Sequence, residues 1–596
     1  MCGIFGVVFP KDRPLGEMLT GAAKRLSYRG YDSVGAAAIT RQGKVDLRKA
    51  PGKLEEVAEK LHFSELFGSR GICQLRWATF GAPSYENAQP HTDSDGDLVG
   101  AHNGNVVNNA ELRRQFLAEG MVVRGTNDGE SCVHAVERYV NRGLPLPEAV
   151  RAAYHDLLGD FAFVVTNNRE NMLVAVKKGS GLVVGIGPNF TCVSSDLPSI
   201  LPLTRKVLPV EDGEMVVLRP EGVELYQVAD GRPIRREIKE VGEEVGLPEK
   251  EGFSHFMLKE IHEQATSARE LMHLLEHSEH LPRLAETIAQ ARRVFLVGSG
   301  SSYHACLIGS AFFSRLAGIL AIPTLPQQFV EQYGPALGPD DVAIYVSQSG
   351  ETKDVLNALG YGSHMGVKAL GLVNVLGSSL TRKVAAYLPL VCGWEISVPA
   401  TKTYTNQVIA LIALAAKVGG QKLSLLASAP QWLARTIRQT DGTAAALARQ
   451  LAKAQKLFIL GYGLGHGIAL EAALKIKEVT GIPCEGMFSS EFKHGPLAVV
   501  EQGTPVLFTT SPKGVEMLTN HVTEVTCRGG YAIVLAPEFA PLRAETSQFI
   551  PLPVASEEEY AVVGAVPFQL FAYHLAVTLG FDPDYPKNLS KTLTVD

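Results

Sequence analysis

The chain has 596 residues, too many for one hydrophobic core, and this length predicts roughly three or four domains. Hydrophobic residues make up 46% and charged residues 20%, as in folded globular proteins, which argues against a disordered chain. A formal net charge of -6 leaves no basic stripe, so nucleic acid and membranes are poor candidate partners and small molecules are favoured.

The chain opens with MCGIFGVV, in which a cysteine directly follows the initiator methionine. Removal of Met1 would leave Cys2 with a thiol and a free α-amine, a pair that can act as a nucleophile and its base. The alternative is that Cys2 is a small apolar residue at the start of a buried strand.

The first part of the chain mixes short β-rich runs, such as GDFAFVVTNN and MLVAVKKG, with helical stretches, and shows no regular βαβ rhythm. This pattern predicts a mixed α/β domain over residues 2–238.

Arg76 in RWATFG suits a substrate carboxylate, and Asp128 in TNDGES suits a substrate ammonium. Asn103 and Gly104 in HNGNVVN can donate to an oxyanion. Each motif alone is ordinary loop chemistry, but together with Cys2 they favour a glutamine site.

Residues 239–251 are predicted to form a linker, because EVGEEVGLPEKE is acidic and lacks periodic apolar residues.

An internal repeat follows, in which AQARRVFLVGSG at 289–300 aligns with AKAQKLFILGYG at 452–463. With the same shift of 163 residues, GVKALGLV at 366–373 falls on GGYAIVLA at 529–536. Hydrophobic strands alternating with helices predict two doubly wound parallel-sheet domains, at 283–422 and 445–585, before a tail at 586–596.

The first copy of the repeat carries SQSGET where the second carries TSPKGV. Hydroxyls, an amide and backbone N–H groups at a helix start can hold a phosphate at the carboxyl edge of such a sheet. The candidates are Ser347, Gln348, Ser349 and Thr352, joined by Ser301 and Ser302 of GSGSSY after the preceding strand. The alternative is an N-cap, which needs one hydroxyl only. Neither GSGSSY at 298–303 nor GYGLGH at 461–466 is a dinucleotide fingerprint, so no nucleotide is indicated.

In the second copy, ALEAALKIKEVTG places Glu471, Lys475 and Glu478 at i, i+4 and i+7, on one face of a predicted helix. The alternative is a solvated face of ion pairs. His494 follows in SSEFKHGPL, before Gly495 and Pro496, and a lone histidine is most often structural.

The eight cysteines are scattered singly, without the paired spacing of zinc sites or disulfide frameworks, which predicts reduced cytosolic thiols. The N-terminus lacks a charged segment followed by an apolar core, and the run VIALIALAA at 408–416 is too short to span a bilayer. We therefore expect a cytoplasmic protein.

The motifs MCGIFG, YRGYDS, RWAT and HNG and the Asp128 segment resemble the N-terminal-nucleophile glutaminase domain of class II amidotransferases. The motifs SQSGET, TKTYTNQ, EAALKIKE and EFKHGPLA and the tail KNLSKTLTVD are similar to the paired sugar isomerase domains of the glutamine–fructose-6-phosphate aminotransferases, also called glucosamine-6-phosphate synthases. The resemblance covers essentially the whole chain. It implies an αββα sandwich followed by two flavodoxin-like domains.

The resemblance also implies roles in a glutaminase site. Cys2 would attack the glutamine amide with its own α-amine as base, and Asn103 and Gly104 would form the oxyanion hole. Glutamine would be held by Arg76, Thr79 and Asp128, and Trp77 is similar to the residue that gates an ammonia channel.

A second set of roles is implied for the sugar site, without a metal or cofactor. Glu478, assisted by Lys475, would move the proton between carbons 1 and 2, and Lys591 would form a Schiff base with the open-chain ketose. His494 would open the ring from the neighbouring subunit of a homodimer. The phosphate would be bound by Ser302, Ser347, Gln348, Ser349 and Thr352, in a site that also includes Ser301 and Val398.

The sequence departs from the family's usual pattern at Phe80, Gln89, Ser299, Ala400 and Pro483. These positions bear on glutaminase coupling and sugar specificity rather than on reaction class. One other function stays open at this point, an amidotransferase or deaminase that acts on another ketose phosphate or uses free ammonia. A sugar-phosphate-sensing module with an inactive glutaminase is not favoured, because it would lack catalytic residues and carry a DNA-reading segment, and neither is the case in this sequence.

Overall fold

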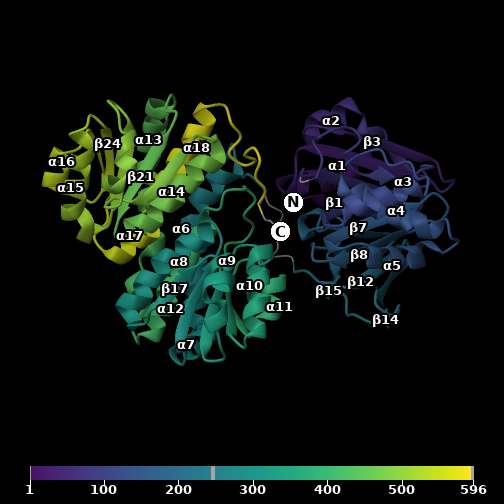
Figure 1. The fold of residues 1–596 in the computed structure, drawn as a ribbon, viewed down its shortest axis with the longest axis horizontal. Helices are drawn as coiled ribbons and strands as arrows, with labels where there is room; N and C mark the ends of the chain where they lie inside the picture. The colour runs from purple at the N-terminus through teal and green to yellow at the C-terminus, as the bar shows by residue number, and fades with distance from the viewer. Residues whose placement is uncertain (1, 79, 243–248, 592–596) are drawn as a thin grey trace. The chain divides into compact units, whose positions relative to one another are not determined.

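The computed structural model describes residues 2–78, 80–242 and 249–591. The chain divides into two compact units, Met1–Pro248 with Ser590–Asp596, and Glu249–Leu589, which we call the N-terminal and C-terminal units (Figure 1). The predicted linker starts with a short strand, β15 (Lys239–Glu240), which pairs with β11 (Lys206–Pro209). Residues 243–248 of that linker lie outside the described residues.

The N-terminal unit contains an eight-stranded and a seven-stranded sheet, in both of which the described pairs are antiparallel. The first has the order β15-β11-β9-β10-β1-β4-β2-β3 and the second β14-β13-β12-β8-β7-β6-β5. Besides β11 and β15, the first contains β1 (Gly3–Pro14), β2 (Ser33–Ile39), β3 (Val45–Pro51), β4 (Phe67–Arg76), β9 (Val183–Ile186) and β10 (Thr191–Ser194). The second contains β5 (His91–Thr92), β6 (Leu98–Val106), β7 (Gly159–Asn167), β8 (Leu173–Lys178), β12 (Glu214–Arg219), β13 (Gly222–Gln227) and β14 (Pro233–Ile234).

The alternation of side chains along β1 explains the layers of this unit. Ile4 and Val8 point into a core with residues of the second sheet, whereas Phe5 and Val7 point to the opposite face. That face is covered by α1 (Gly16–Arg25) and α2 (Leu54–Lys60), and the outer face of the second sheet by α3 (Asn109–Ala118), α4 (Asp128–Val140) and α5 (Leu146–Asp156). The four layers confirm the predicted αββα sandwich.

The C-terminal unit contains two five-stranded parallel sheets, in the orders β17-β16-β18-β19-β20 and β22-β21-β23-β24-β25. Both follow the flavodoxin-like order 2-1-3-4-5. The first comprises β16 (Arg293–Gly298), β17 (Ala321–Thr324), β18 (Asp341–Ser347), β19 (Lys368–Val373) and β20 (Ala386–Pro389). The second comprises β21 (Leu457–Tyr462), β22 (Cys484–Phe488), β23 (Pro505–Thr510), β24 (Tyr531–Ala536) and β25 (Gln548–Pro551). The repeated parallel-sheet architecture that the sequence predicted is thus confirmed.

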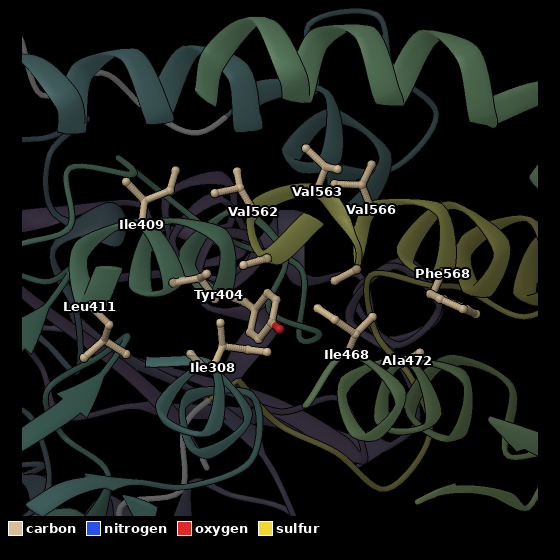
Figure 2. Packing of buried hydrophobic residues seen from close by; sticks show 14 of the residues in the cluster. Ile308, Tyr404, Ile409, Leu411, Ile468, Ala472, Val562, Val563, Val566 and Phe568 are labelled. Atoms are coloured by element: carbon tan, nitrogen blue, oxygen red, sulfur yellow. The ribbon is translucent and has the colours of Figure 1, made fainter. Parts of the chain in front are cut away.

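Helices cover both faces of each sheet. The outer face of the first sheet carries α10 (Lys353–His364) and α11 (Ser379–Lys383), with α9 (Pro326–Gln328) beside α10, and the outer face of the second carries α15 (Val515–Thr526) and α16 (Ala540–Ala544). The inner faces share one core cluster with α6 (Phe256–His277), α7 (His280–Ala289), α8 (Ser301–Phe312), α12 (Lys402–Val418), α13 (Ala429–Leu451), α14 (Gly465–Thr480), α17 (Glu557–Val563) and α18 (Val566–Thr578). In Figure 2, Tyr404 and Ile409 of α12 lie in this cluster with Ile308 of α8 and Ile468 of α14.

Two apolar segments of the C-terminal unit belong to this shared core. The run VIALIALAA lies in α12, in which all residues from 402 to 416 are buried. The stretch Glu557–Thr578 is long and apolar enough to cross a membrane, but 83% of its apolar window is buried inside the protein. Within the described residues, both therefore act as core helices.

Candidate active sites

Cys2 lies directly before β1, half-buried, beside the end of β4. The Trp77 backbone N–H donates to its Sγ at 3.3 Å, and the thiol lies 3.5 Å from the Trp77 carbonyl. The Cys2 carbonyl accepts a hydrogen bond from Arg29 Nε at 3.0 Å. Burial raises the pKa of the Cys2 thiol, while the nearby Arg76 guanidinium lowers it. The thiol is therefore held by backbone contacts at the junction of β1 and β4, rather than enclosed in the apolar core.

Arg76 ends β4 and is fully buried. Its guanidinium donates to the carbonyls of Gly81 at 2.6 Å and Ala82 at 3.4 Å, and to that of Phe80. Among the described residues its Nε has no hydrogen-bond partner. Burial lowers the pKa of Arg76, and the Cys2 thiol and Asp128 oppose this. A buried guanidinium whose hydrogen bonds go mainly to neutral carbonyl groups can bind a substrate carboxylate.

Trp77 and Asp128, two further predicted glutamine-site residues, are close to these. Trp77 packs edge-on against Tyr31, with ring centroids 5.8 Å apart. Asp128 begins α4 and is buried, and its carboxylate accepts a hydrogen bond from the Val106 N–H at 2.9 Å. Thr79 lies outside the described residues. The start of α4 is thereby tied to the end of β6, which carries Asn103 and Gly104.

Asn103 and Gly104 are neighbours on β6. The Asn103 side chain is 1% exposed, and its Nδ2 donates to Ser195 Oγ at 2.7 Å. Its Oδ1 is buried without a partner among the described residues. Gly104 has φ +115°, and a Cβ there would lie 2.1 Å from the Asp160 carbonyl oxygen. The backbone at this point therefore requires glycine.

We expect Gly104→Ala to destabilise the N-terminal unit by about 1–3 kcal/mol and to reduce glutamine hydrolysis, because the added Cβ forces β6 away from β7. Thermal unfolding and the rate of glutamine hydrolysis measure the two effects. Gly96→Ala is the matched control, because Gly96 also has a positive φ, +83°, but a Cβ there meets nothing within 4 Å. Equal losses in the two variants would show that positive φ alone, and not the contact with Asp160, is responsible.

In the C-terminal unit, the two predicted phosphate loops follow β16 and β18, which are neighbours in the first sheet. This is the switch point at which parallel sheets of this order bind ligands. The Gly350 N–H donates to Ser347 Oγ at 3.0 Å, and Thr352 Oγ1 lies 3.4 Å from the same oxygen. The Glu351 N–H donates to Ser349 Oγ at 3.1 Å. These bonds hold the hydroxyl-rich loop together at the start of α10.

The loop after β16 is tied to two helices of the C-terminal unit. Gln407 of α12 donates from Nε2 to Ser302 Oγ at 2.9 Å. Because the Ser302 oxygen accepts this bond, its hydroxyl hydrogen is available to another acceptor, such as a phosphate. Ser301 Oγ donates to Glu471 Oε1 at 2.9 Å. Ser302 thus keeps a donor for a ligand, whereas the Ser301 hydroxyl contacts the carboxylate face of α14.

Glu471, Lys475 and Glu478 do lie on one face of α14. Lys475 Nζ is 2.6 Å from Glu478 Oε2 and 3.6 Å from Glu471 Oε1, and His304 Nδ1 is 2.8 Å from Glu471 Oε2. Glu471 and Lys475 are 0% and 1% exposed, so the alternative of a solvated ion-pair face is wrong.

The charges on this face of α14 are mutually stabilised. Burial lowers the pKa of Lys475, but the carboxylates of Glu478 and Glu471 outweigh burial and hold the pKa above its usual value. Burial raises the pKa of Glu471, but Lys475 and His304 outweigh it and hold the pKa below its usual value. The cluster therefore places a carboxylate and an ammonium side by side in a mostly dry environment, but both pKa shifts point away from neutrality, opposite to the direction that assists proton transfer.

Three predicted sugar-site residues are placed separately. His494 is exposed, at the end of a 3₁₀ turn (Phe492–His494). Val398 is buried, and its N–H donates to the Asp584 carbonyl at 3.0 Å. Lys591 groups with the N-terminal unit, so its proximity to Glu478 stays a prediction.

The sequence did not predict a role for three residues near the sites, Ser195, His304 and Gln407, and it identified Gln89 only as a departure from the family pattern. Gln89, one of the departures from the family pattern, accepts a hydrogen bond from the His102 N–H at 2.6 Å and so fixes β6 next to Asn103. Gln407 lies inside the motif TKTYTNQ, which was the one available signal.

Comparisons with known proteins cover both units. A model of the SIS domain family matches residues 287–417 and 450–579, and a glutamine amidotransferase domain model matches residues 76–201. Proteins named glutamine–fructose-6-phosphate aminotransferase (isomerizing) from Methanothermobacter thermautotrophicus and Aquifex aeolicus are 38% and 37% identical, over 100% of this chain and of theirs.

Solved structures resemble the C-terminal unit. The C-terminal domain of glucosamine-fructose-6-phosphate aminotransferase from Francisella tularensis is 26% identical with a TM-score of 0.52, covering 56% of this chain and 100% of that one. Tagatose-6-phosphate ketose/aldose isomerase from Escherichia coli is 18% identical with a TM-score of 0.50, covering 56% of this chain and 95% of that one, a likeness of fold alone.

Proposed function

Because the chain belongs to the glutamine–fructose-6-phosphate aminotransferase (isomerizing) family, we propose that the residues described above carry out its two half-reactions. The enzyme transfers the amide nitrogen of glutamine to fructose 6-phosphate and isomerises the product to glucosamine 6-phosphate, with glutamate as the second product.

In the proposed glutaminase step, the Cys2 thiol attacks the side-chain carbonyl of glutamine after its proton passes to the α-amine of Cys2. A thioester forms and ammonia leaves, and water then releases glutamate. Asn103 and the Gly104 N–H stabilise the oxyanion of the tetrahedral intermediate. The glutamine itself is held by Arg76 at its carboxylate, by Asp128 at its ammonium group, and by Thr79 and Trp77. The half-buried thiol beside a buried, carbonyl-bound Arg76 is the observation that supports this assignment most directly.

In the proposed sugar step, the open-chain ketose forms a Schiff base with Lys591, and released ammonia replaces the lysine at carbon 2. Glu478 then moves a proton from carbon 1 to carbon 2, with Lys475 stabilising its carboxylate form. The Lys475–Glu478 distance of 2.6 Å and the burial of Lys475 support this pairing. The phosphate is bound by Ser302, Ser347, Gln348, Ser349 and Thr352, with Ser301 and Val398 in the same site.

We further propose a cytoplasmic homodimer in which His494 of the neighbouring subunit opens the sugar ring. The exposure of His494 in the single chain supports this arrangement, because a ring-opening residue supplied to a second subunit has to face outward. We also propose that the two sugar isomerase domains span residues 283–422 and 445–585. The matched stretches 287–417 and 450–579 support these boundaries.

The test is an assay of the purified protein with fructose 6-phosphate and glutamine, in which we expect glucosamine 6-phosphate and glutamate in equal amounts. Parallel reactions replace fructose 6-phosphate by other ketose phosphates and glutamine by ammonium. Product from another ketose phosphate alone would contradict the proposed substrate, and glutamate without any amino sugar would contradict the coupling of the two sites.

A further inference from the structure

The hydroxyl of Ser195 joins three strands of the N-terminal unit. Ser195 directly follows β10, and its Oγ accepts a hydrogen bond from the Ile4 N–H at 2.8 Å, while its own N–H donates to the Ile4 carbonyl at 3.0 Å. The same Oγ lies 2.7 Å from Asn103 Nδ2 on β6. Ile4 is two residues beyond Cys2 on β1. One side chain therefore connects the strand that presents the nucleophile to the strand that presents the oxyanion donors.

The Asn103 amide has two orientations in this environment. In the orientation found in the structure, Nδ2 contacts Ser195 and Oδ1 is buried without a partner among the described residues. In that orientation one N–H of Nδ2 remains for an oxyanion, because a carbonyl oxygen repels a developing negative charge and an N–H group stabilises it, but the buried Oδ1 is left unsatisfied. A rotation of the amide by 180° exchanges its two ends, whose shapes are nearly identical.

The rotated orientation has a partner ready at Ser195. A serine hydroxyl is both a donor and an acceptor, and the Ile4 N–H already occupies the Ser195 oxygen as a donor. The hydroxyl hydrogen can then go either to the Ile4 carbonyl, 3.4 Å away, or to the rotated Asn103 Oδ1. The second choice satisfies the buried carbonyl oxygen of Asn103 and leaves Nδ2 free for the substrate.

We propose that Ser195 is a positioning residue of the glutaminase reaction, which orients the Asn103 amide so that Nδ2 faces the oxyanion. This rests on the glutaminase function proposed above. Ser195 touches neither Cys2 Sγ nor the substrate in this account. It acts through Asn103, and also fixes the register of β1 behind Cys2.

Ser194 provides a matched control. It is the adjacent residue, 0% exposed, and its Oγ donates to the same Ile4 carbonyl at 3.0 Å. Its Oγ also accepts hydrogen bonds from the Asp196 N–H and from Ser199 Oγ, and does not contact Asn103. Loss of its hydroxyl therefore perturbs the same strand junction without affecting the amide.

The experiment measures glutamine hydrolysis by the full chain with Ser195→Ala, Ser195→Thr and Ser194→Ala. We expect Ser195→Ala to lower kcat by about 10–100-fold, less than the loss of a whole oxyanion donor, with KM for glutamine within about twofold. Ser195→Thr, which keeps the hydroxyl, is expected to retain most of kcat, and Ser194→Ala to leave kcat within about threefold. Thermal unfolding of each variant, measured in parallel, reports whether the N-terminal unit is folded.

A second measurement separates orientation of the amide from general damage. The aldehyde analogue of glutamine, glutamate γ-semialdehyde, adds to a thiol to form a tetrahedral hemithioacetal that mimics the intermediate. Its inhibition constant is expected to rise about tenfold in Ser195→Ala, while that of glutamate, which lacks the tetrahedral centre, stays unchanged. Unchanged kcat in Ser195→Ala, an effect on KM alone, or an equal loss in Ser194→Ala would overturn the proposal. Absence of glutamine hydrolysis in the unsubstituted chain would overturn the proposed function together with it.

Discussion

Replacement of Cys2 by alanine is expected to abolish glutamine-dependent synthesis of glucosamine 6-phosphate and to leave ammonium-dependent synthesis intact. The loss should be on the order of 10³-fold or more, because the thioester intermediate cannot form without the nucleophile. The side chain is half-buried, and its contacts are with the Trp77 backbone, so its removal leaves the β1–β4 pairing in place. The phosphate loops and the charged face of α14 belong to the other compact unit.

The measurement is the initial rate of glucosamine 6-phosphate formation with each nitrogen donor at saturating fructose 6-phosphate. Cys73→Ala is the control, because Cys73 is a fully buried thiol on β4 that belongs to an apolar core cluster. This variant is expected to keep both activities at permissive temperature. If Cys2→Ala still formed product from glutamine at more than about a tenth of the normal rate, Cys2 would not be the nucleophile.

The second large effect is expected for Glu478→Gln, which should lower amino sugar synthesis from both glutamine and ammonium by about 10²–10⁴-fold. The amide has nearly the shape of the carboxylate but cannot accept the proton from carbon 1. Lys475 keeps Glu471 as a counter-charge at 3.6 Å, so the buried ammonium is not left unpaired and the fold should persist. Glutamine hydrolysis should be retained.

Glu485→Gln is the comparison for this variant, because Glu485 is an exposed carboxylate on β22, only seven residues further along the chain. It is expected to leave both synthesis rates unchanged. A selective loss of the glutamine-dependent rate in Glu478→Gln would argue against proton transfer by Glu478, because that step is common to both nitrogen donors.

The sequence allowed accurate prediction of those features that repeat locally. The helical spacing of Glu471, Lys475 and Glu478 predicted their common face, and their contacts on α14 follow from it. The repeat shift of 163 residues relates β19 to β24, which begin and end at the corresponding positions. The short edge strands β17 and β22 were not predicted, because four or five residues carry too little periodicity.

The contacts that complete the two sites could not be predicted in the same way. Asn103 and Ser195 are 92 residues apart, Ser302 and Gln407 are 105 apart, and His304 and Glu471 are 167 apart. Such pairs meet because separate strands and helices pack together, and neither partner carries a local pattern that indicates the other. Burial of Lys475 could not be predicted either, because charged residues on one helix face have the same sequence spacing whether that face is exposed to solvent or buried.

The core cluster that spans both sheets of the C-terminal unit has a consequence for how this chain can evolve. Although the two halves share one repeated pattern, α12 and α14 bury their apolar faces in the same cluster. Because the two halves share this core, removal of either half would expose apolar residues of the other, so a chain that carries one copy alone is not expected to be viable. The two copies therefore have to be inherited together. Within this shared unit, the first copy can supply the hydroxyl-rich loop for an anion, and the second can supply the charged face of α14.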